Sequence, residues 1–296
     1  MRLSKSRWII GVDLDRRIKL LALDVDGTLA SEGNEVTSAT RKALHQVLQT
    51  GIVVALCTGR RFRNASYIFK SLGRSLYSVC LGGSIVKDPN GNTLQAMNYS
   101  GKDFLKVAGT VQASGQTVVA QCDLPGIDFF IDGSRPWNRE TSRYYEMNHS
   151  FAHWSSNITE EVTVDVLAIG SFGDPEEMSL LADRINAQFP REFTVHVMKS
   201  VGPNSSYCEI LPVGIDKWAG LTALAGILGI ADDEICAVGD ELNDFEMVKN
   251  AGLGLAMRNA RPELKEIADR VVGRNDEDGL VPFLEELAAA GPGGAC

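Results

Sequence analysis

The sequence lacks three features that would each indicate a whole class of protein. It has no basic run, and with 29 Lys and Arg against 38 Asp and Glu its net charge is −9, so nucleic acid and anionic membranes are not expected partners. No apolar run approaches the roughly 18 residues that a membrane-spanning helix needs. No internal repeat or long low-complexity linker is present. We therefore expect a cytoplasmic protein with packed apolar cores.

Cysteine and histidine are too few and too scattered to indicate a disulfide framework or a zinc site. None of the six cysteines forms a Cys-x-x-Cys pair, and Cys57, Cys80 and Cys236 lie in apolar runs. We expect them to be small buried side chains in a reducing compartment. His149 and His153 have i, i+4 spacing, but they are not part of a recognisable zinc-binding pattern. The chemistry of this chain has to come from other side chains.

Two aspartates follow the first apolar run of the chain. Residues 19–23 predict a strand buried on both faces, and Asp24 and Asp26 come next, before a turn at Gly27 and Thr28. Open α/β sheets place their chemistry at the carboxyl ends of strands. There, Asp24 is suited to be a nucleophile or a ligand for a hard cation, and Asp26 to be a general acid and base. A plain Asp-x-Asp-Gly turn is the alternative interpretation.

A calcium-binding loop is a second alternative for the same residues. Asp24, Asp26 and Glu35 fit positions one, three and twelve of such a loop. Position six, where a sharp bend requires glycine, is Leu29, and a strand rather than a helix precedes the loop. The sequence therefore argues against calcium.

Strand-like and helical stretches alternate on both sides of a differently patterned middle segment. Residues 19–84 predict strand, helix, strand, helix, strand, and similar units resume over 206–290. Together they indicate an α/β fold with a Rossmann-like, doubly wound parallel sheet. Residues 85–205 mix hairpins with helical crossovers, and we expect them to form an inserted α+β module. Residues 1–18 and 291–296 are expected to be tails.

Thr58-Gly59-Arg60 lies at the end of the second predicted strand. The plainer role for Thr58 is to cap a helix, but its hydroxyl and the N–H groups of Gly59 and Arg60 are also suited to bind phosphate. Lys217 lies in the first turn of a later helix, where the macrodipole disfavours a cation. Taken alone it is a surface lysine. Beside Asp24, its ammonium would bind phosphate and hold that carboxylate ionised.

Asp240, Asn243 and Asp244 follow the strand predicted over residues 235–238. Asp240 is a competent helix cap, yet its position is equivalent to that of Asp24. Both could ligate one Mg²⁺, which prefers oxygen ligands and keeps several waters, with Asn243 or Asp244 in support. All these segments fall on one edge of one predicted sheet, and we give that joint placement more weight than any single motif.

In this order the segments resemble the four motifs of the haloacid dehalogenase superfamily phosphatases. The motifs are Asp24-Val25-Asp26-Gly27-Thr28, Thr58-Gly59-Arg60, Lys217 and Gly239-Asp240-x-x-Asn243-Asp244. The insertion between the second and third motifs resembles the α/β cap of the Cof-type subgroup, and the resemblance runs from about residue 19 to 290. In that subgroup an Asn-Gly pair usually follows the third strand, where this chain has Gly82-Gly83.

The resemblance implies a role for each motif residue. Asp24 would attack phosphorus and form an aspartyl-phosphate, while Asp26 would protonate the leaving oxygen and then activate water. The remaining implied roles are phosphoryl binding by Thr58, Gly59, Lys217 and Asn243, Mg²⁺ ligation by Asp24, the Asp26 carbonyl and Asp240, and support from Arg60 and Asp244.

The expected function is Mg²⁺-dependent hydrolysis of small phosphorylated metabolites, sugar phosphates above all, by a monomer or small homo-oligomer. Two alternatives stay open, a sugar phosphomutase of the same superfamily and a non-catalytic sensor of phosphorylated metabolites. The intact pair of Asp24 and Asp26 argues against the sensor, since a binding protein does not need the second acid. Five residues of the inserted module could also face the site, although an ordinary surface position is the plainer interpretation for most of them: Arg135, Trp137, Arg139, Arg143 and His153.

Overall fold

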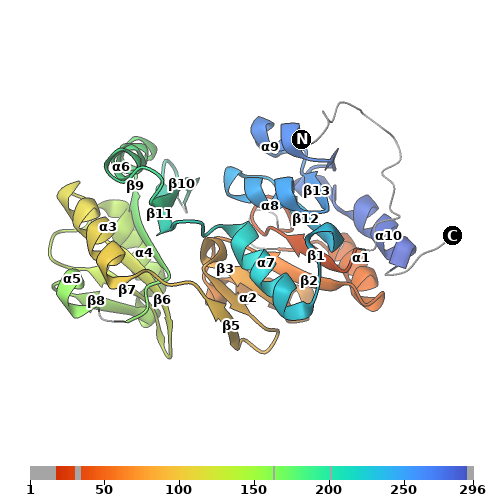
Figure 1. Cartoon of the computed structure of the whole chain (residues 1–296), viewed down its shortest axis with the longest axis horizontal. Helices are drawn as coiled ribbons and strands as arrows, with labels where there is room; N and C mark the ends of the chain where they lie inside the picture. The colour runs from red at the N-terminus through yellow and green to blue at the C-terminus, as the bar shows by residue number, and fades with distance from the viewer. Residues whose placement is uncertain (1–17, 31–34, 163, 201, 292–296) are drawn as a thin grey trace.

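The computed structural model describes residues 18–30, 35–162, 164–200 and 202–291, which form two lobes (Figure 1). One lobe contains both the first and the last described segments, and the middle of the chain forms the other. Of the two expected tails, only residues 18 and 291 are among the described residues. No helix in the described ranges combines the length and apolar character that a membrane span requires.

The first lobe is built on an eight-stranded sheet. Its strands are β1 (Leu20–Leu23), β2 (Val53–Cys57), β3 (Tyr77–Cys80), β4 (Ile85–Lys87), β5 (Thr93–Ala96), β12 (Ile235–Gly239), β13 (Leu253–Ala256) and β14 (Arg270–Val271). They lie in the order β14-β13-β12-β1-β2-β3-β4-β5, and the pairs from β14 to β3 are all parallel. The central strands are continuously apolar because both of their faces are buried.

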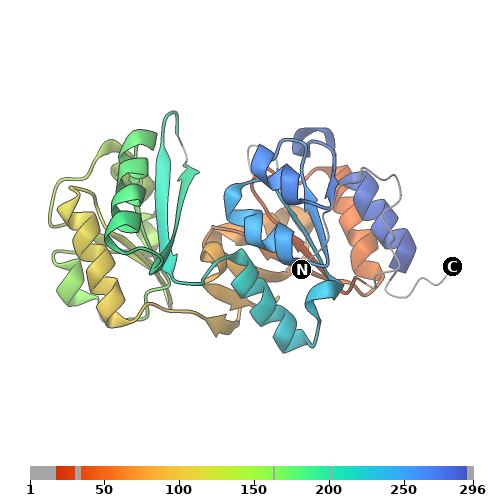
Figure 2. The same cartoon turned by 45° about the horizontal axis from the view of Figure 1, so that its top comes forward.

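Helices cover both faces of this sheet, and β1 shows why its sequence is apolar throughout. The helices are α1 (Ser38–Gln49), α2 (Phe62–Leu72), α7 (Lys217–Leu228), α8 (Phe245–Asn250), α9 (Pro262–Ile267) and α10 (Val281–Ala290). Leu21 belongs to the core beneath α1, α2 and α10, whereas Leu20 belongs to the core beneath α7. Helices α1 and α10 lie side by side (Figures 1 and 2). The expected doubly wound, Rossmann-like sheet is confirmed.

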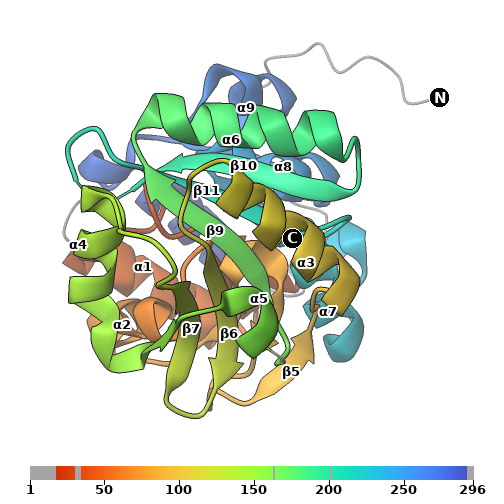
Figure 3. The same cartoon turned by 90° about the vertical axis from the view of Figure 1, so that its left-hand side faces the viewer.

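The second lobe is built on a six-stranded, mainly antiparallel sheet. Its strands are β6 (Val119–Leu124), β7 (Ile127–Asp132), β8 (Ala152–Ser155), β9 (Ala168–Gly173), β10 (Phe193–Lys199) and β11 (Ser206–Pro212), in the order β10-β11-β9-β6-β7-β8. Helices α3 (Gly101–Ala113), α5 (Ile158–Glu161) and α6 (Pro175–Gln188) cover its outer face (Figure 3). Helix α4 (Arg139–Asn148) packs on the opposite, inner face through Tyr144 and Tyr145.

The boundaries between the two lobes differ from those expected at residues 85 and 205. Residues 85–96, expected in the inserted module, form β4 and β5, which extend the eight-stranded sheet by antiparallel pairing. Strand β11, expected in the core, pairs with β9 and β10 in the second lobe. Sequence patterns indicate a strand but not its partner, because pairing depends on tertiary contacts. The inserted lobe thus runs from α3 to β11.

The register of the central strands brings their ends to one level. Leu23 of β1 lies opposite Val238 of β12 on one side and Leu56 of β2 on the other. Because these strands are parallel, the residues that follow them share one edge of the sheet. That edge carries Asp24 and Thr58, as the sequence predicts.

Candidate active site

Three buried carboxylates meet at this sheet edge. Asp24, Asp240 and Asp244 each offer an oxygen, and these oxygens all lie within 4.8 Å of one another. Asp24 follows β1 directly and Asp240 follows β12, while Asp244 closes a single 3₁₀ turn over Leu242–Asp244. All three side chains are almost completely shielded from solvent. Segments from opposite ends of the chain thus build one acidic cluster.

Lys217 is the cation within this cluster. It is the first residue of α7, it is 2% exposed, and its Nζ lies 2.6 Å from Asp24 Oδ1 and 2.5 Å from Asp244 Oδ1. Burial acts to lower the pKa of Lys217, but the two carboxylates outweigh it and the pKa is raised. The ammonium therefore stays protonated. The plainer interpretation of Lys217 as a surface lysine is wrong.

The cluster holds more negative than positive charge. Burial raises the pKa of Asp24 well above its usual range and Asp244 raises it further, while Lys217 opposes both. Burial and then Asp244 raise the pKa of Asp240 to about 7, although Thr28 Oγ1 donates a hydrogen bond of 3.0 Å to Asp240 Oδ1. One ammonium beside three carboxylates leaves an excess of buried negative charge. A hard cation with oxygen ligands would relieve it.

The hydrogen bonds of Asp244 distinguish it from the other two carboxylates. Its Oδ1 accepts from Lys217, and its Oδ2 accepts from the N–H groups of Asp240 and Glu241 at 3.0 and 3.1 Å. Both oxygens of Asp244 thus hold the turn and the lysine in place. Asp24 and Asp240 each keep one oxygen outside these bonds. The donor set fits Mg²⁺, with Asp24 and Asp240 as the carboxylates best placed to ligate it.

Asp26 lies apart from the buried cluster, with its side chain 63% exposed. Arg60 makes a two-point ion pair with it, in which Arg60 Nε lies 2.8 Å from Asp26 Oδ2 and Nη2 contacts Oδ1. Such a planar pair orients the carboxylate. Gly27, with φ +81°, lies against Asp240, and a Cβ there would be 2.3 Å from Asp240 Oδ2. Glycine at this position therefore lets the two strand ends approach.

Thr58 lies beside the acid pair in the loop that follows β2. It is 1% exposed, and its Oγ1 accepts a hydrogen bond of 3.1 Å from the N–H of Arg60. Helix α2 begins later, at Phe62, and Arg61 precedes it. Thr58 is therefore not a helix cap. The structure places its hydroxyl in the same loop that supplies the partner of Asp26.

The inserted lobe reaches the site through Met198 of β10. Asn243 Nδ2 lies 3.3 Å from Met198 Sδ, and a Cβ built on Gly59 would lie 3.7 Å from the Met198 methyl carbon. One side chain thus covers two of the residues expected to bind phosphate. Because Gly59 follows β2 and Asn243 follows β12, Met198 brings β10 against the carboxyl ends of these two strands.

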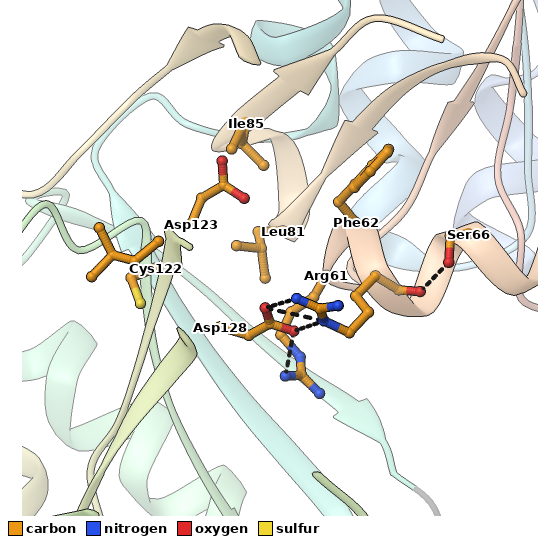
Figure 4. Close-up of a pocket in the computed structure, with 10 residues that line it drawn as sticks. Arg61, Phe62, Ser66, Leu81, Ile85, Cys122, Asp123 and Asp128 are labelled. Carbon is orange, nitrogen blue, oxygen red and sulfur yellow. Dashed lines mark hydrogen bonds and ion pairs between the residues drawn. The ribbon is translucent and has the colours of Figure 1, made fainter. Parts of the chain in front are cut away.

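A second contact between the lobes lies beside α2 (Figure 4). Arg61, which is 5% exposed, donates from Nη1 to Asp128 Oδ2 at 3.1 Å and also contacts Asn148. Arg63 bonds the same Asp128 carboxylate. These pairs border a cavity of about 250 Å³ that is lined from both lobes. Because Arg61 directly follows the Thr58 loop, this contact ties that loop to the inserted lobe.

Comparisons with known proteins decide the family. A family model described as haloacid dehalogenase-like hydrolase matches residues 21–284. The chain belongs to this family. The family indicated by its four motifs is thereby confirmed.

This hydrolase has relatives that are phosphatases. It is 27% identical to 5-amino-6-(5-phospho-D-ribitylamino)uracil phosphatase YcsE of Bacillus subtilis, over 91% of this chain and 96% of that protein. It is 28% identical to the HMP-PP phosphatase of Yersinia enterocolitica, over 90% and 94% of the two chains. A solved haloacid dehalogenase-like hydrolase from B. subtilis superposes with a TM-score of 0.75 at 25% identity, covering 91% and 100%. The chain is an enzyme of the phosphatase class.

The structure shows the surroundings of two of the inserted-lobe residues that the sequence offered for the site of this hydrolase. Trp137 packs on Tyr145 at 4.8 Å between ring centroids, and His153 lies 5.0 Å from the Phe130 ring, so both are engaged within their own lobe. Met198, which the sequence did not offer, is an inserted-lobe side chain that contacts Asn243. The alternating pattern of β10 predicts two faces, but it does not indicate which face meets the other lobe.

Proposed function

We propose that this chain is a Mg²⁺-dependent phosphatase of small phosphorylated metabolites that works through an aspartyl-phosphate on Asp24. The observation that carries the proposal is the position of Lys217 between Asp24 and Asp244, with Asp240 in the same cluster. An ammonium 2.6 Å from Asp24 opposes the burial that raises the pKa of this carboxyl, and Mg²⁺ bound beside it would further favour the ionised form that a nucleophile requires. The same ammonium would bind an oxygen of the incoming phosphoryl group.

Two proton transfers accompany the two bond changes at phosphorus. Asp24 attacks phosphorus as the bond to the leaving oxygen breaks, and Asp26 gives its proton to that oxygen. Asp26 then takes a proton from water as the water attacks the aspartyl-phosphate, which releases phosphate and regenerates Asp24. The solvent-facing position of Asp26 lets it take up from water the proton that it donates, and its ion pair with Arg60 opens for this step.

The remaining site residues bind and neutralise the phosphoryl oxygens. In this proposal those oxygens would contact Lys217, the Thr58 hydroxyl, the Gly59 N–H group and Asn243. Asp24, Asp240 and the Asp26 carbonyl would hold Mg²⁺, which supplies positive charge to the phosphoryl group when it is bound. Catalysis of phosphoryl transfer rests mainly on such positioning and charge neutralisation.

The inserted lobe and the relatives support a proposal for the substrate class. Met198 covers the site from the second lobe, which favours small substrates over phosphorylated macromolecules. Two relatives are phosphatases whose names specify small phosphorylated metabolites. We propose sugar and polyol phosphates as the substrate class. Free, buried cysteines such as Cys57 and Cys236 suit the reducing cytoplasm in which we place the enzyme.

Phosphate release from a panel of esters, with and without Mg²⁺, tests this function. The panel comprises p-nitrophenyl phosphate, sugar phosphates, nucleotides and cofactor phosphates. We expect Mg²⁺-dependent release that Asp24→Asn reduces by about a thousandfold or more. Asp183→Asn, an exposed change on α6, is the control and should retain full activity.

Three outcomes would contradict the proposal. Full activity in Asp24→Asn would exclude the aspartyl-phosphate. Isomerised sugar phosphate without free phosphate would indicate a mutase. Ligand binding without turnover across the whole panel would indicate a sensor.

A further inference from the structure

Glu209, on β11, is a buried carboxylate that the proposed mechanism does not use. Its side chain is fully shielded from solvent, and within the described part of the chain neither Oε1 nor Oε2 has a hydrogen-bond partner. An unpartnered buried carboxylate is costly, so proteins rarely keep one without a function. Burial raises the pKa of Glu209 to about 7, against the opposing charge of Lys217.

The carboxylate lies over the turn that separates two of the phosphate-binding elements. A Cβ built on Gly82 would lie 2.7 Å from Glu209 Oε2. The N–H of Gly82 donates to the carbonyl of Thr58 at 3.3 Å, and a Cβ on Gly83 would lie 1.9 Å from the carbonyl oxygen of Asp216. The Gly82-Gly83 turn thus fits between the Thr58 loop and the start of α7. Glu209 faces this turn from the other lobe.

The position of Glu209 in the second sheet also indicates that its side chain is directed at the site. Glu209 lies opposite His196 of β10, and Met198 is two residues along that strand on the same face. Met198 contacts Asn243, so this face is the one directed at the site. Strand β11 then continues into the segment that leads to Lys217 (Figures 1 and 2). The glutamate therefore lies where the leaving group of a bound phosphate ester would extend from the phosphoryl site into the inserted lobe.

We propose that Glu209 determines substrate specificity by binding hydroxyl groups of the leaving group. This inference rests on the proposed function, because it assumes a phosphoryl group held by Lys217 and Thr58. The charge of the site selects the kind of donor. Lys217 and Arg60 already supply positive charge at the site, so a neutral hydroxyl is a better donor to Glu209 than a second ammonium. The preferred substrates are therefore phosphorylated polyols or sugars whose hydroxyls lie near the phosphate.

The small size of residue 82 is part of this arrangement. Gly82 has φ +60°, and any side chain there would have to displace the Glu209 carboxylate or the Leu211 methyl, which would lie 2.8 Å from its Cβ. Glycine lets the turn pack against the carboxylate and offers it no side-chain donor, so both carboxylate oxygens keep their accepting capacity. A substrate hydroxyl can then supply the hydrogen bond that the protein itself does not.

The test compares two esters in the full-length enzyme with Mg²⁺. One is ribose 5-phosphate, whose leaving group carries hydroxyls, and the other is p-nitrophenyl phosphate, whose leaving group has no hydrogen-bond donor. We expect Glu209→Leu to lower the ratio of kcat/KM for the first ester to that for the second by about tenfold to a hundredfold. Glu209→Gln, which keeps one acceptor oxygen, should restore part of the ratio. Glu192→Gln is the matched control, an exposed glutamate paired with Lys106, and should leave the ratio unchanged.

Two results would overturn the inference. An unchanged ratio of the two kcat/KM values in Glu209→Leu would mean that Glu209 does not bind the leaving group. An equal fall for both esters would indicate a general structural role. The proposed function has a separate readout, since wild-type turnover of p-nitrophenyl phosphate reports phosphoryl transfer alone; if that turnover is absent, both proposals are wrong.

The wild-type enzyme provides a test that does not depend on how the variants fold. Its kcat/KM is compared between ribose 5-phosphate and 2-deoxyribose 5-phosphate, and then between other sugar phosphates and their deoxy analogues. Loss of the hydroxyl that Glu209 binds should lower kcat/KM at least about tenfold for one analogue in the series. Equal kcat/KM across the whole series would contradict the proposal.

Discussion

Lys217 Nζ lies 2.6 Å from Asp24 Oδ1, although the two residues are 193 positions apart in the chain. The carboxylate is placed by the end of β1 and the ammonium by the first residue of α7, and the whole inserted lobe lies between them in sequence. Asp244 completes the arrangement at 2.5 Å from the same ammonium. The proposed nucleophile and the proposed phosphate-binding cation thus belong to one buried network of charges. A substitution in this network is expected to affect both the free energy of unfolding and the activity.

Replacement of Lys217 should destabilise the fold strongly. Lys217→Met leaves the Asp24 and Asp244 carboxylates buried without their cation, which typically costs about 3 to 5 kcal/mol. Urea unfolding at pH 8 in the presence of EDTA measures this loss. Lys217→Met combined with Asp244→Asn should recover part of it, because one unpaired charge is removed.

Lys106→Met is the matched control for this prediction. Lys106 pairs with Glu192 on the surface of the second lobe, where solvent screens the charges. We expect little change in stability. An equal loss in the Lys106 and Lys217 variants would show that the buried network has no special importance.

Mg²⁺ should stabilise the folded protein through Asp240. A ligand present at about a hundred times its Kd stabilises the folded state by about 2.7 kcal/mol. Thermal unfolding with increasing MgCl₂ should therefore show a rising Tm that EDTA reverses. Asp240→Asn should abolish the rise, and the exposed change Asp183→Asn should retain it. A rise that persists in Asp240→Asn would place the metal elsewhere.

Glu209 should make stability depend on pH in a defined direction. Its pKa is raised from 4.5 to about 7 in the folded protein, so the folded state binds this proton more tightly than the unfolded state does. The resulting stabilisation is complete below pH 4.5 and is lost as the pH rises through 7. Between pH 5 and pH 8 we expect the wild type to lose about 2 to 3 kcal/mol more than Glu209→Gln.

Urea unfolding of both proteins at several pH values measures this difference. Other groups of the acidic cluster also titrate, but they are common to both proteins and cancel in the comparison. Parallel curves for the wild type and Glu209→Gln would mean that the carboxylate is ionised throughout this range or is solvated.

The contact between Arg61 and Asp128 should hold the lobes in their closed arrangement. Asp128→Ala removes the carboxylate shared by Arg61 and Arg63, and it leaves the Arg61 guanidinium buried beside the Phe129 ring. We expect a several-fold rise in KM for phosphate esters, because Arg61 directly follows the Thr58 loop. Steady-state kinetics measure the change. Asp103→Asn, on the exposed face of α3, is the control, and an unchanged KM in Asp128→Ala would show that this contact does not position the loop.

The segments of the site could be predicted from the sequence because the carboxyl ends of parallel strands lie at one edge of a sheet. Continuous apolar runs such as residues 20–23 and 235–238 indicate strands buried on both faces, and parallel strands end at one edge. Polar residues that follow such runs must therefore lie near one another. This is why the sequence predicts that Asp24, Thr58 and Asp240 lie close together.

Other features of the site were not readable from local pattern. The ion pair of Arg60 with Asp26 depends on the loop that follows β2, and the burial of Lys217 depends on how the start of α7 meets β1. Glu209 lies on a strand whose alternation predicts two faces without indicating which one meets the first lobe. These relationships arise between segments, and periodicity within a segment carries no information about them.

By itself, the sequence determined the doubly wound sheet, the edge on which the four motifs gather and the family to which the chain belongs. Only the tertiary structure decided which sheet β4, β5 and β11 join, which acid each cation neutralises, and which side chains of the inserted lobe cover the site. The physical reason is that local apolar periods specify strands and their buried faces, whereas pairing and the packing of one lobe on another depend on shape and charge contributed by distant parts of the chain.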